Sequence, residues 1–177
     1  IEIRRYQPLI VAQLDIHGDH EDAFARGLER LQRYFEGAND AQLRLASTPE
    51  LRHEMFSGGW KISMALTGVD EEALPRAYDR SIRVLHMPEH LVAAFRYRGE
   101  EHEAERDIAR LRLLSGLEHH PEYVPISRVY WARLDPPQTL SLVRRNEARV
   151  ELDTAALPRT APNDAATWML AGLPIVF

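Results

Sequence analysis

Hydrophobic and polar positions alternate near the start of the chain. This alternation predicts strands over 1–6 and 9–16, separated by Pro8, which cannot donate a backbone hydrogen bond. The apolar side of the second strand consists of Ile10, Ala12, Leu14 and Ile16. Gly18 ends the pattern and marks the next element.

A helix is expected directly after this glycine. Asp19 is a suitable N-cap, and Asp22 adds an acidic residue to the first turn. One helical face is then defined by apolar residues at Phe24, Leu28, Leu31 and Phe35. Gly37 stands where a C-cap belongs.

The strands that follow are less regular. A short strand is expected over 43–47, before Pro49, and a longer one over 60–67 after the Gly58-Gly59 turn. One face of the longer strand consists of Trp60, Ile62, Met64 and Leu66. A further short strand is expected over 81–85.

The second half of the chain restarts the same order of elements. The strand pattern over 90–98 ends at Gly99, and a second helix follows with Gly116 as its expected cap. Its inward positions are expected to be Ala104, Ile108, Leu111 and Ser115. Sliding the chain by 81 residues superposes Gly18 on Gly99, which favours a duplicated strand-helix-strand-strand unit. The alternative is a coincidence of the kind that any α+β chain can show.

The last strands surround a rigid break. A strand over 130–134 leads into Asp135-Pro136-Pro137, and another strand begins at Asn146. That strand has Ala148, Val150 and Leu152 on one face and Glu147, Arg149 and Glu151 on the other. The proline-containing extension over 153–177 ends in apolar residues, so we expect it to pack back on the domain, fill a cavity or contact a second copy as a homodimer.

Composition narrows the class of protein. The chain has 177 residues, of which 45% are hydrophobic and 28% are charged, as in an ordinary soluble domain. The net charge of −5 argues against nucleic acid as the main partner. The absence of cysteine excludes disulfides and thiolate chemistry, and no apolar run is long enough to span a membrane. We expect a cytoplasmic protein, although a chain that begins at Ile1 leaves room for an upstream signal.

Several segments resemble the SOUL/haem-binding family. The opening 1–6 with Pro8 is similar to the family's start, and the stretch 33–39 is similar to its "YIFGGN"-type element. Asp135-Pro136-Pro137 together with Arg144-Arg145-Asn146-Glu147 matches its closing signature. The stretch 43–50 departs from the family's "KIAMTAPV"-like strand and keeps only an alanine and a Thr-Pro pair.

This resemblance implies an α+β fold over 1–152. It would be a curved antiparallel sheet of about eight strands, or a distorted barrel, with two main helices and pseudo-two-fold βαββ symmetry. The resemblance also implies an apolar groove for haem, another tetrapyrrole or a similar flat molecule, in a carrier or sensor without enzymatic activity. Some members of the family have been connected with protein partners, and related GyrI-like binders include hydrolases.

The candidate ligand-binding residues follow from this expectation. Haem requires an apolar slot, cations for its propionates and an axial ligand such as His, Met or Tyr. We expect the ligand to be bound by His17, His20, Leu28, Arg33, His53 and Met64, with His17 and His20 as the candidate iron ligands. Five of these residues have a plainer alternative: His17 and His20 would be polar residues of an exposed turn, Arg33 a partner of the helix dipole, and Leu28 and Met64 core residues.

Two other classes of function stay open. A hydrolase would need a carboxylate of raised pKa beside a tyrosine in an apolar pocket, and Glu147, Tyr97, Tyr123 and Tyr130 are the available groups. No phosphate loop, HExxH sequence or nucleophile elbow is present. The third class is a protein-interaction module that uses the extension over 153–177.

Overall fold

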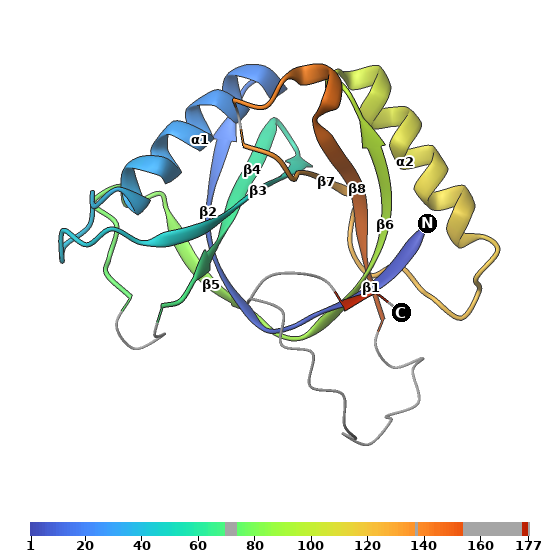
Figure 1. Ribbon diagram of the computed structural model, residues 1–177, viewed down its shortest axis with the longest axis horizontal. Helices are drawn as coiled ribbons and strands as arrows, with labels where there is room; N and C mark the ends of the chain where they lie inside the picture. The colour runs from blue at the N-terminus through green and yellow to red at the C-terminus, as the bar shows by residue number, and fades with distance from the viewer. Residues whose placement is uncertain (70–73, 137, 154–174, 177) are drawn as a thin grey trace.

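The strands of the described residues belong to one antiparallel sheet that curls round on itself (Figure 1). The computed structural model describes residues 1–69, 74–136, 138–153 and 175–176. The strands are β1 (Glu2–Tyr6), β2 (Leu9–His17), β3 (Ala46–Phe56), β4 (Gly59–Thr67), β5 (Arg83–Met87), β6 (His90–Arg98), β7 (Tyr130–Arg133), β8 (Arg145–Leu152) and the two-residue β9 (Ile175–Val176). Their order across the sheet is β5-β2-β4-β3-β7-β8-β6-β1-β9. The predicted α+β class and the curved antiparallel sheet are confirmed.

Two helices lie on the outer side of the curled sheet (Figure 1). Helix α1 (His20–Phe35) packs on β2, β3 and β4, and α2 (Glu103–Leu117) packs on β6 and β8. No helix in the described part of the chain combines the length and apolar character that a bilayer span requires. The helices therefore cover one face of the sheet and leave the other face to the inside of the curl.

The two halves of the chain have equivalent topology. The segments β2-α1-β3-β4 and β6-α2-β7-β8 occupy the sheet in mirrored order and meet where β3 pairs with β7. Gly18 and Gly99 precede the two helices with φ of 125° and 109°, a conformation that favours glycine. This arrangement agrees with the expected repeat, whereas common descent of the two halves stays a prediction.

Helix α1 begins and ends where the sequence predicts. The side chain of Asp19 accepts a hydrogen bond from the Asp22 backbone N–H at 3.0 Å, so the expected N-cap is present. Gly37 follows the C-cap residue with φ of 112°.

Helix α2 presents a different face to the sheet from the one predicted. Its buried residues are Arg106, Ala109, Leu113 and Leu117, whereas Ile108 and Leu111 are 55% and 58% exposed. The prediction was wrong because leucines and isoleucine occur on both sides of this helix, so spacing alone does not select the inner face. Gly116 lies inside the helix rather than at its end, and a side chain there would meet Ile1.

The strand expected over 43–47 was also misplaced. Strand β3 begins at Ala46 and continues through Pro49 to Phe56. Its pairing with β4 changes register between Ser47 and Leu51, and such an irregularity accommodates a proline that cannot donate to the sheet. The strand expected over 81–85 lies slightly later, at Arg83–Met87.

The C-terminal extension is described only at Asp153 and at Ile175–Val176. Ile175 and Val176 pair with Arg5 and Arg4 of β1. The apolar stretch 168–170 lies outside the described residues, so the expected role of the extension in packing or dimer formation stays a prediction.

Strand β8 is buried on both faces, which its alternating sequence did not suggest. Ala148, Val150 and Leu152 pack under the helices, while Glu147 and Arg149 are 0% and 2% exposed inside the curl. Buried charges require ionic partners because burial removes their hydration. The network around Glu147 provides these partners.

The Glu147 carboxylate is surrounded by three arginines. Arg4 of β1 donates to both of its oxygens, at 2.8 and 2.9 Å, and Arg149 and Arg96 approach to 2.7 and 2.9 Å. Arg149 also forms a two-point ion pair with Glu50 of β3, at 2.6 and 2.9 Å. Burial raises the pKa of Glu147, but Arg149 and Arg4 outweigh burial and lower this pKa to about 2. The network thus connects β1, β3, β6 and β8 across the inside of the sheet.

Replacing Glu147 by glutamine is expected to lower the free energy of unfolding by about 3–5 kcal/mol, because buried arginines lose their counter-ion. Urea unfolding followed by tryptophan fluorescence measures this loss. The matched control is Glu29→Gln, which removes a carboxylate that is 59% exposed and paired with Arg33. The control should change stability by less than about 0.5 kcal/mol. Equal losses in the two variants would contradict a special role of the network.

Candidate functional site

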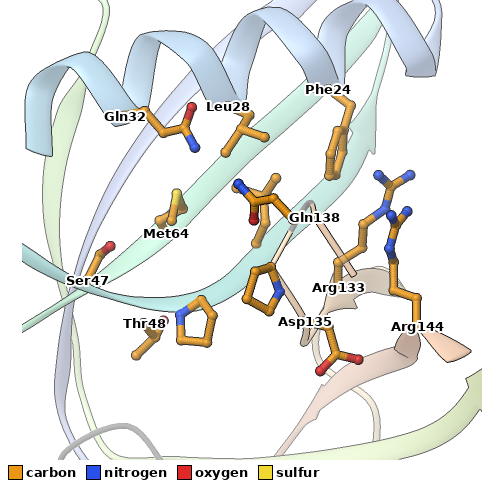
Figure 2. A pocket seen from close by; sticks show the side chains of 13 residues that line it. Phe24, Leu28, Gln32, Ser47, Thr48, Met64, Arg133, Asp135, Gln138 and Arg144 are labelled. Atoms are coloured by element: carbon orange, nitrogen blue, oxygen red, sulfur yellow. The ribbon is translucent and has the colours of Figure 1, made fainter. Parts of the chain in front are cut away.

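A cavity of about 370 Å³ lies between α1, the β3–β4 pair and the connection from β7 to β8 (Figure 2). Its apolar lining consists of Phe24, Leu28, Pro49, Leu51, Met64 and Pro136. Its polar lining consists of Gln32, Ser47, Thr48, Arg133, Asp135, Gln138 and Arg144. The volume is within the range of small-molecule sites in proteins.

Helical spacing positions the roof of this cavity. Phe24, Leu28 and Gln32 are four residues apart on α1, so their side chains project from one face, as Figure 2 shows. The irregular start of β3 contributes Ser47 and Thr48 on the opposite side. The register shift beside Pro49 therefore lies at the cavity itself.

Two arginines give the cavity a cationic end. Arg133 and Arg144 both line the cavity and are labelled in Figure 2. The guanidinium carbon of Arg133 lies 3.7 Å from the centroid of the Phe24 ring, and Arg144 donates to the Thr139 carbonyl at 2.9 Å. The nearby Asp135 carboxylate is bound to Arg145 at 2.6 Å, so it is already paired with a cation. The cavity thus combines apolar walls with a positive end.

A buried polar cluster lies behind Phe24 and Arg133. The Glu101 carboxylate has three partners: His53 Nε2 at 2.7 Å, Arg133 Nε at 2.7 Å and the Tyr97 hydroxyl at 3.1 Å. Burial raises the pKa of Glu101, but His53 and Arg133 outweigh burial and hold it well below its usual range. Glu101 therefore stays ionised and orients Arg133 toward the cavity.

His20 belongs to the same cluster. Its Nδ1 lies 3.0 Å from Arg106 Nη1, and its ring is in contact with those of His53, Trp60 and Phe24. Burial lowers the pKa of His20 to about 3, with further contributions from His53 and Arg106. His20 is consequently a neutral imidazole at ordinary pH.

The six candidate residues fall into three groups. Leu28 and Met64 line the cavity. His20 and His53 are buried behind Phe24, in contact with its ring but not among the lining residues.

The other two candidates lie outside the cavity. His17 is exposed, with Nδ1 3.2 Å from the Gly58 carbonyl oxygen, and its ring contacts Phe56 edge-on. The side chain of Arg33 is 69% exposed and pairs with Glu29 at 2.6 Å. The structure thus gives both residues local partners away from the groove, and their role in ligand binding stays a prediction.

The sequence analysis did not identify the two arginines at the cationic end of the cavity, or Glu101, which orients one of them. Arg144 was noticed as part of the closing signature, for which the sequence favoured a structural role, and Arg133 had no pattern to distinguish it. Glu101 had a usable signal, because the 81-residue shift that superposes Gly18 on Gly99 also places it on His20. His20 and Glu101 thus occupy equivalent positions after equivalent turns, and such positions are expected to lie close to each other near the pseudo-two-fold axis.

The cavity suits the flat apolar macrocycle of haem and its propionates, but it offers few side chains that could ligate the iron. The cavity offers apolar walls for a macrocycle and two arginines for propionates. Met64 is the one described lining residue with a side chain suited to ligate iron, and no group of three His, Asp or Glu in the described ranges is arranged to hold a metal ion. His20 Nε2 and His53 Nδ1 are buried without a hydrogen-bond partner, and both rings contact Phe24, but neither residue lines this cavity. His53 instead lines a second cavity of about 410 Å³.

The fold and the cavity together define a class of protein: a curved antiparallel sheet with two outer helices and an apolar groove beside the first. The description "SOUL heme-binding protein" matches residues 1–151, and the chain belongs to this family. No curated protein matches the chain by sequence.

Solved structures show the same fold at low sequence identity. The C-terminal domain of EcmrR is 12% identical with a TM-score of 0.63, over 85% of this chain and 95% of that one. EcmrR in a DNA complex is 11% identical with the same TM-score, and the match spans 85% of this chain but only 56% of that one. SAV2435 bound to tetraphenylphosphonium is 10% identical with a TM-score of 0.51, over 87% and 94%. A protein from Listeria innocua described as a hydrolase is 13% identical with a TM-score of 0.56, over 86% and 92%.

Stability should depend on pH through His20. The unfolded chain protonates this histidine near pH 6.5, whereas the folded protein does so only near pH 3. Between these values the unfolded state binds more protons, so stability falls as the pH falls. We expect a contribution approaching 1.4 kcal/mol per pH unit between about pH 6 and pH 5, above the range where carboxylates titrate.

Urea unfolding at several pH values measures this slope. His20→Gln should remove it, and His17→Gln, which changes an exposed histidine three residues earlier, should retain it. A His20→Gln variant with the full slope would show that another group is responsible.

Proposed function

We propose that this protein binds a flat hydrophobic molecule with an acidic group, such as haem or another tetrapyrrole, and acts as a carrier or sensor. The observation that carries this proposal is the apolar cavity with Arg133 and Arg144 at one end. Membership of the family named for haem binding agrees with it.

The energetics suit an amphipathic ligand. Removing a planar apolar body from water is favourable by roughly 25 cal/mol per Å² of buried surface. An acidic group at the other end would meet arginines, which form strong charge-assisted hydrogen bonds with carboxylates. Glu101 and Phe24 already fix the side chain of Arg133, so less conformational entropy would be lost on binding.

Haem is compatible with this proposal if the protein holds it mainly through the macrocycle and the propionates and not through a strong iron ligand. Arg133 and Arg144 would hold the propionates, Phe24 and Leu28 would pack against the macrocycle, and Met64 is the lining residue that could ligate the iron. Haem, when bound, supplies an iron centre that can bind small ligands or exchange electrons. Ligation by His20 or His53 would require a rearrangement, because neither residue lines the cavity.

A hydrolase acting on a hydrophobic compound is the second candidate, and the Listeria innocua neighbour bears that description. A buried carboxylate–tyrosine pair does occur, because Tyr97 donates to Glu101 at 3.1 Å. However, the pKa of Glu101 is lowered by His53 and Arg133, and the pKa of Tyr97 is raised by burial and by Glu101. A general base needs a pKa near the working pH, so these shifts disfavour the pair as a water-activating site. The carrier or sensor is therefore the better-supported proposal.

Filling the cavity tests the location of the site. Leu28→Trp should weaken binding of protoporphyrin IX by at least about tenfold, because the larger side chain occupies the space of the macrocycle. Titration followed by quenching of tryptophan fluorescence would be calibrated separately for this variant. Arg26→Ala, which removes a side chain that is 52% exposed on the same helix, should bind within about twofold of the unchanged protein. Failure of the unchanged protein to bind either hemin or protoporphyrin IX would refute the proposal for tetrapyrroles.

The acidic end of the ligand can be tested separately. The unchanged protein should bind protoporphyrin IX about tenfold more tightly than its dimethyl ester, because the ester cannot pair with a guanidinium. Arg144→Gln should reduce this preference while leaving the affinity for the ester nearly constant. Equal affinity for acid and ester in the unchanged protein would argue against the arginines as the recognition element.

A further inference from the structure

The second cavity, of about 410 Å³, lies on the inner face of the curled sheet. Strands β2, β3 and β4 each contribute two side chains that are two residues apart, so these side chains project from one face, opposite to the face that the helices cover (Figure 1). They are Val11 and Gln13, Arg52 and Glu54, and Lys61 and Ser63. None of the described residues that line this inner cavity lines the cavity beside α1. The two cavities are therefore separate candidate sites.

The inner cavity has an apolar side and a polar side that carries two cations. The apolar side consists of Val11, Leu85, Met87 and Pro88. The two cations, Arg52 and Lys61, are diagonal neighbours in the β3–β4 pair, because Arg52 lies opposite Ser63 and Lys61 lies opposite Glu54. A ligand that suits this cavity thus combines an apolar body with a polar end.

Arg52 is held in place but has few acceptors for its hydrogen bonds. Its guanidinium carbon lies 4.1 Å from the centroid of the Tyr130 ring, and its side chain is only 17% exposed. Its described polar contacts are a hydrogen bond to the Met87 sulfur at 3.4 Å and an ion pair with Glu151 at 3.5 Å. A guanidinium has five N–H donors, and a thioether sulfur is a weak acceptor. Arg52 thus offers donors to a ligand from a position that the Tyr130 ring has already fixed.

The other charged groups of the inner cavity have less need of a ligand. Lys61 and Glu54 form an ion pair at 3.2 Å, and the side chains of Lys61, Glu54 and Glu151 are 26% to 34% exposed. Water reaches these three groups more easily than it reaches Arg52, so Arg52 gains most from an additional partner. A cationic ligand would instead compete with Arg52 and Lys61 for carboxylates that already have partners. The cavity therefore favours an anionic ligand.

A small recess adjoins the inner cavity at Arg52. It has a volume of about 30 Å³, room for about two water-sized groups, and it shares Arg52 and Tyr130 with the inner cavity. Tyr6 also lines the recess, and its buried hydroxyl has no hydrogen-bond partner among the described residues. Glu50 is the carboxylate of the recess, and both of its oxygens already accept from Arg149, at 2.6 and 2.9 Å. The recess thus adds an unused hydroxyl to the unused donors of Arg52.

We propose that the inner cavity binds a small carboxylate with an apolar body, such as an aromatic acid. The carboxylate pairs with Arg52 beside the recess, and Lys61 adds a second positive charge. The body of the ligand replaces water on the apolar side of the cavity, against Val11, Leu85 and Met87. This site goes beyond the proposed tetrapyrrole binding, because a different set of side chains on the opposite face of the sheet forms it.

Lys61 provides a reporter for this site, because it is the only lysine in the chain and lines the inner cavity. Reductive methylation with ¹³C-formaldehyde labels its amine for NMR and keeps its positive charge. The N-terminal amine is labelled as well, and its signal is recognised by the lower pKa of an α-amino group. Titration of the full chain with trans-cinnamate should shift the Lys61 signal and saturate at concentrations on the order of 1–10 mM.

A matched ligand and a matched variant test the charge and the location. Cinnamamide has the same apolar body without the charge, and it should bind at least about fivefold more weakly than trans-cinnamate. Leu28→Trp fills the cavity beside α1, so it should leave the cinnamate titration unchanged. Binding of protoporphyrin IX is measured in parallel, so a failure of the inner site is distinguishable from a failure of the tetrapyrrole site.

Two variants of the inner cavity should weaken cinnamate binding by at least about tenfold. Arg52→Gln removes the cation that pairs with the carboxylate. Leu85→Trp fills the apolar side from a partly exposed position of the edge strand β5, so it leaves the core intact. The control is Arg83→Gln on the same strand, which removes an exposed arginine that pairs with Asp15 and does not line the cavity. This control should bind within about twofold of the unchanged protein.

Four results would overturn the proposal. They are a Lys61 signal that does not shift saturably with trans-cinnamate, equal binding of the acid and the amide, loss of the shift in Leu28→Trp, and full binding by both Arg52→Gln and Leu85→Trp. Tighter binding of 3-phenylpropylamine than of trans-cinnamate would also contradict it, because the carboxylates of the cavity would then be the recognition element.

Discussion

The buried carboxylate of Glu147 is the interaction on which the curved sheet depends. It accepts from Arg4, Arg96 and Arg149, which belong to β1, β6 and β8, and the pair of Arg149 with Glu50 extends the network to β3. A curled sheet brings the side chains of its inner face close together, and here charges of both signs meet on part of that face, beside a second cavity of about 410 Å³. Because each charge has partners, the cost of its dehydration is offset by ion pairs and hydrogen bonds.

The network around Glu147 lies on the inner face of the sheet. The outer face can therefore serve for apolar packing and for a ligand. The helices cover most of that face, but the register shift in β3 and the loop after β7 leave a cavity beside α1. A second buried carboxylate, Glu101, supports this cavity in the way that Glu147 supports the inner face. Glu101 orients Arg133 and keeps it in contact with Phe24, so the cationic end of the cavity is prepared before any ligand arrives.

The proposed function involves the connection between β7 and β8. Gln138 and Arg144 of this connection line the cavity, whereas Leu140, Leu142 and Val143 are exposed. The closing signature of the family thus lies next to the candidate site: Asp135 binds Arg145, and Arg144 lines the cavity. Most of the signature has a structural role, but Arg144 combines structure with a position in the candidate site.

The sequence by itself determined the class of fold and most of the elements. Alternation, the Asp19 cap and the glycines at 18, 37 and 99 are local signals, and local signals are sufficient to place β2, α1, β4 and β6. The sequence also indicated Leu28 and Met64, because helical and strand periodicity predicts which side chains share a face. The resemblance to the family predicted, in addition, that the sheet is curved.

Only the tertiary structure decided which charged residues are buried and which residues form the candidate site. Glu101, His53 and Arg133 come from three separate segments, and their contact depends on how β3, β7 and the start of α2 are packed. The inner face of α2 was likewise undetermined, because Ile108 and Leu111 are as apolar as the residues that the sheet covers. Alternation in β8 separates its two faces, but whether the second face meets water or other charges depends on the curl of the whole sheet. That curl is set by pairing between strands that are distant in the sequence, and no local pattern predicts this pairing.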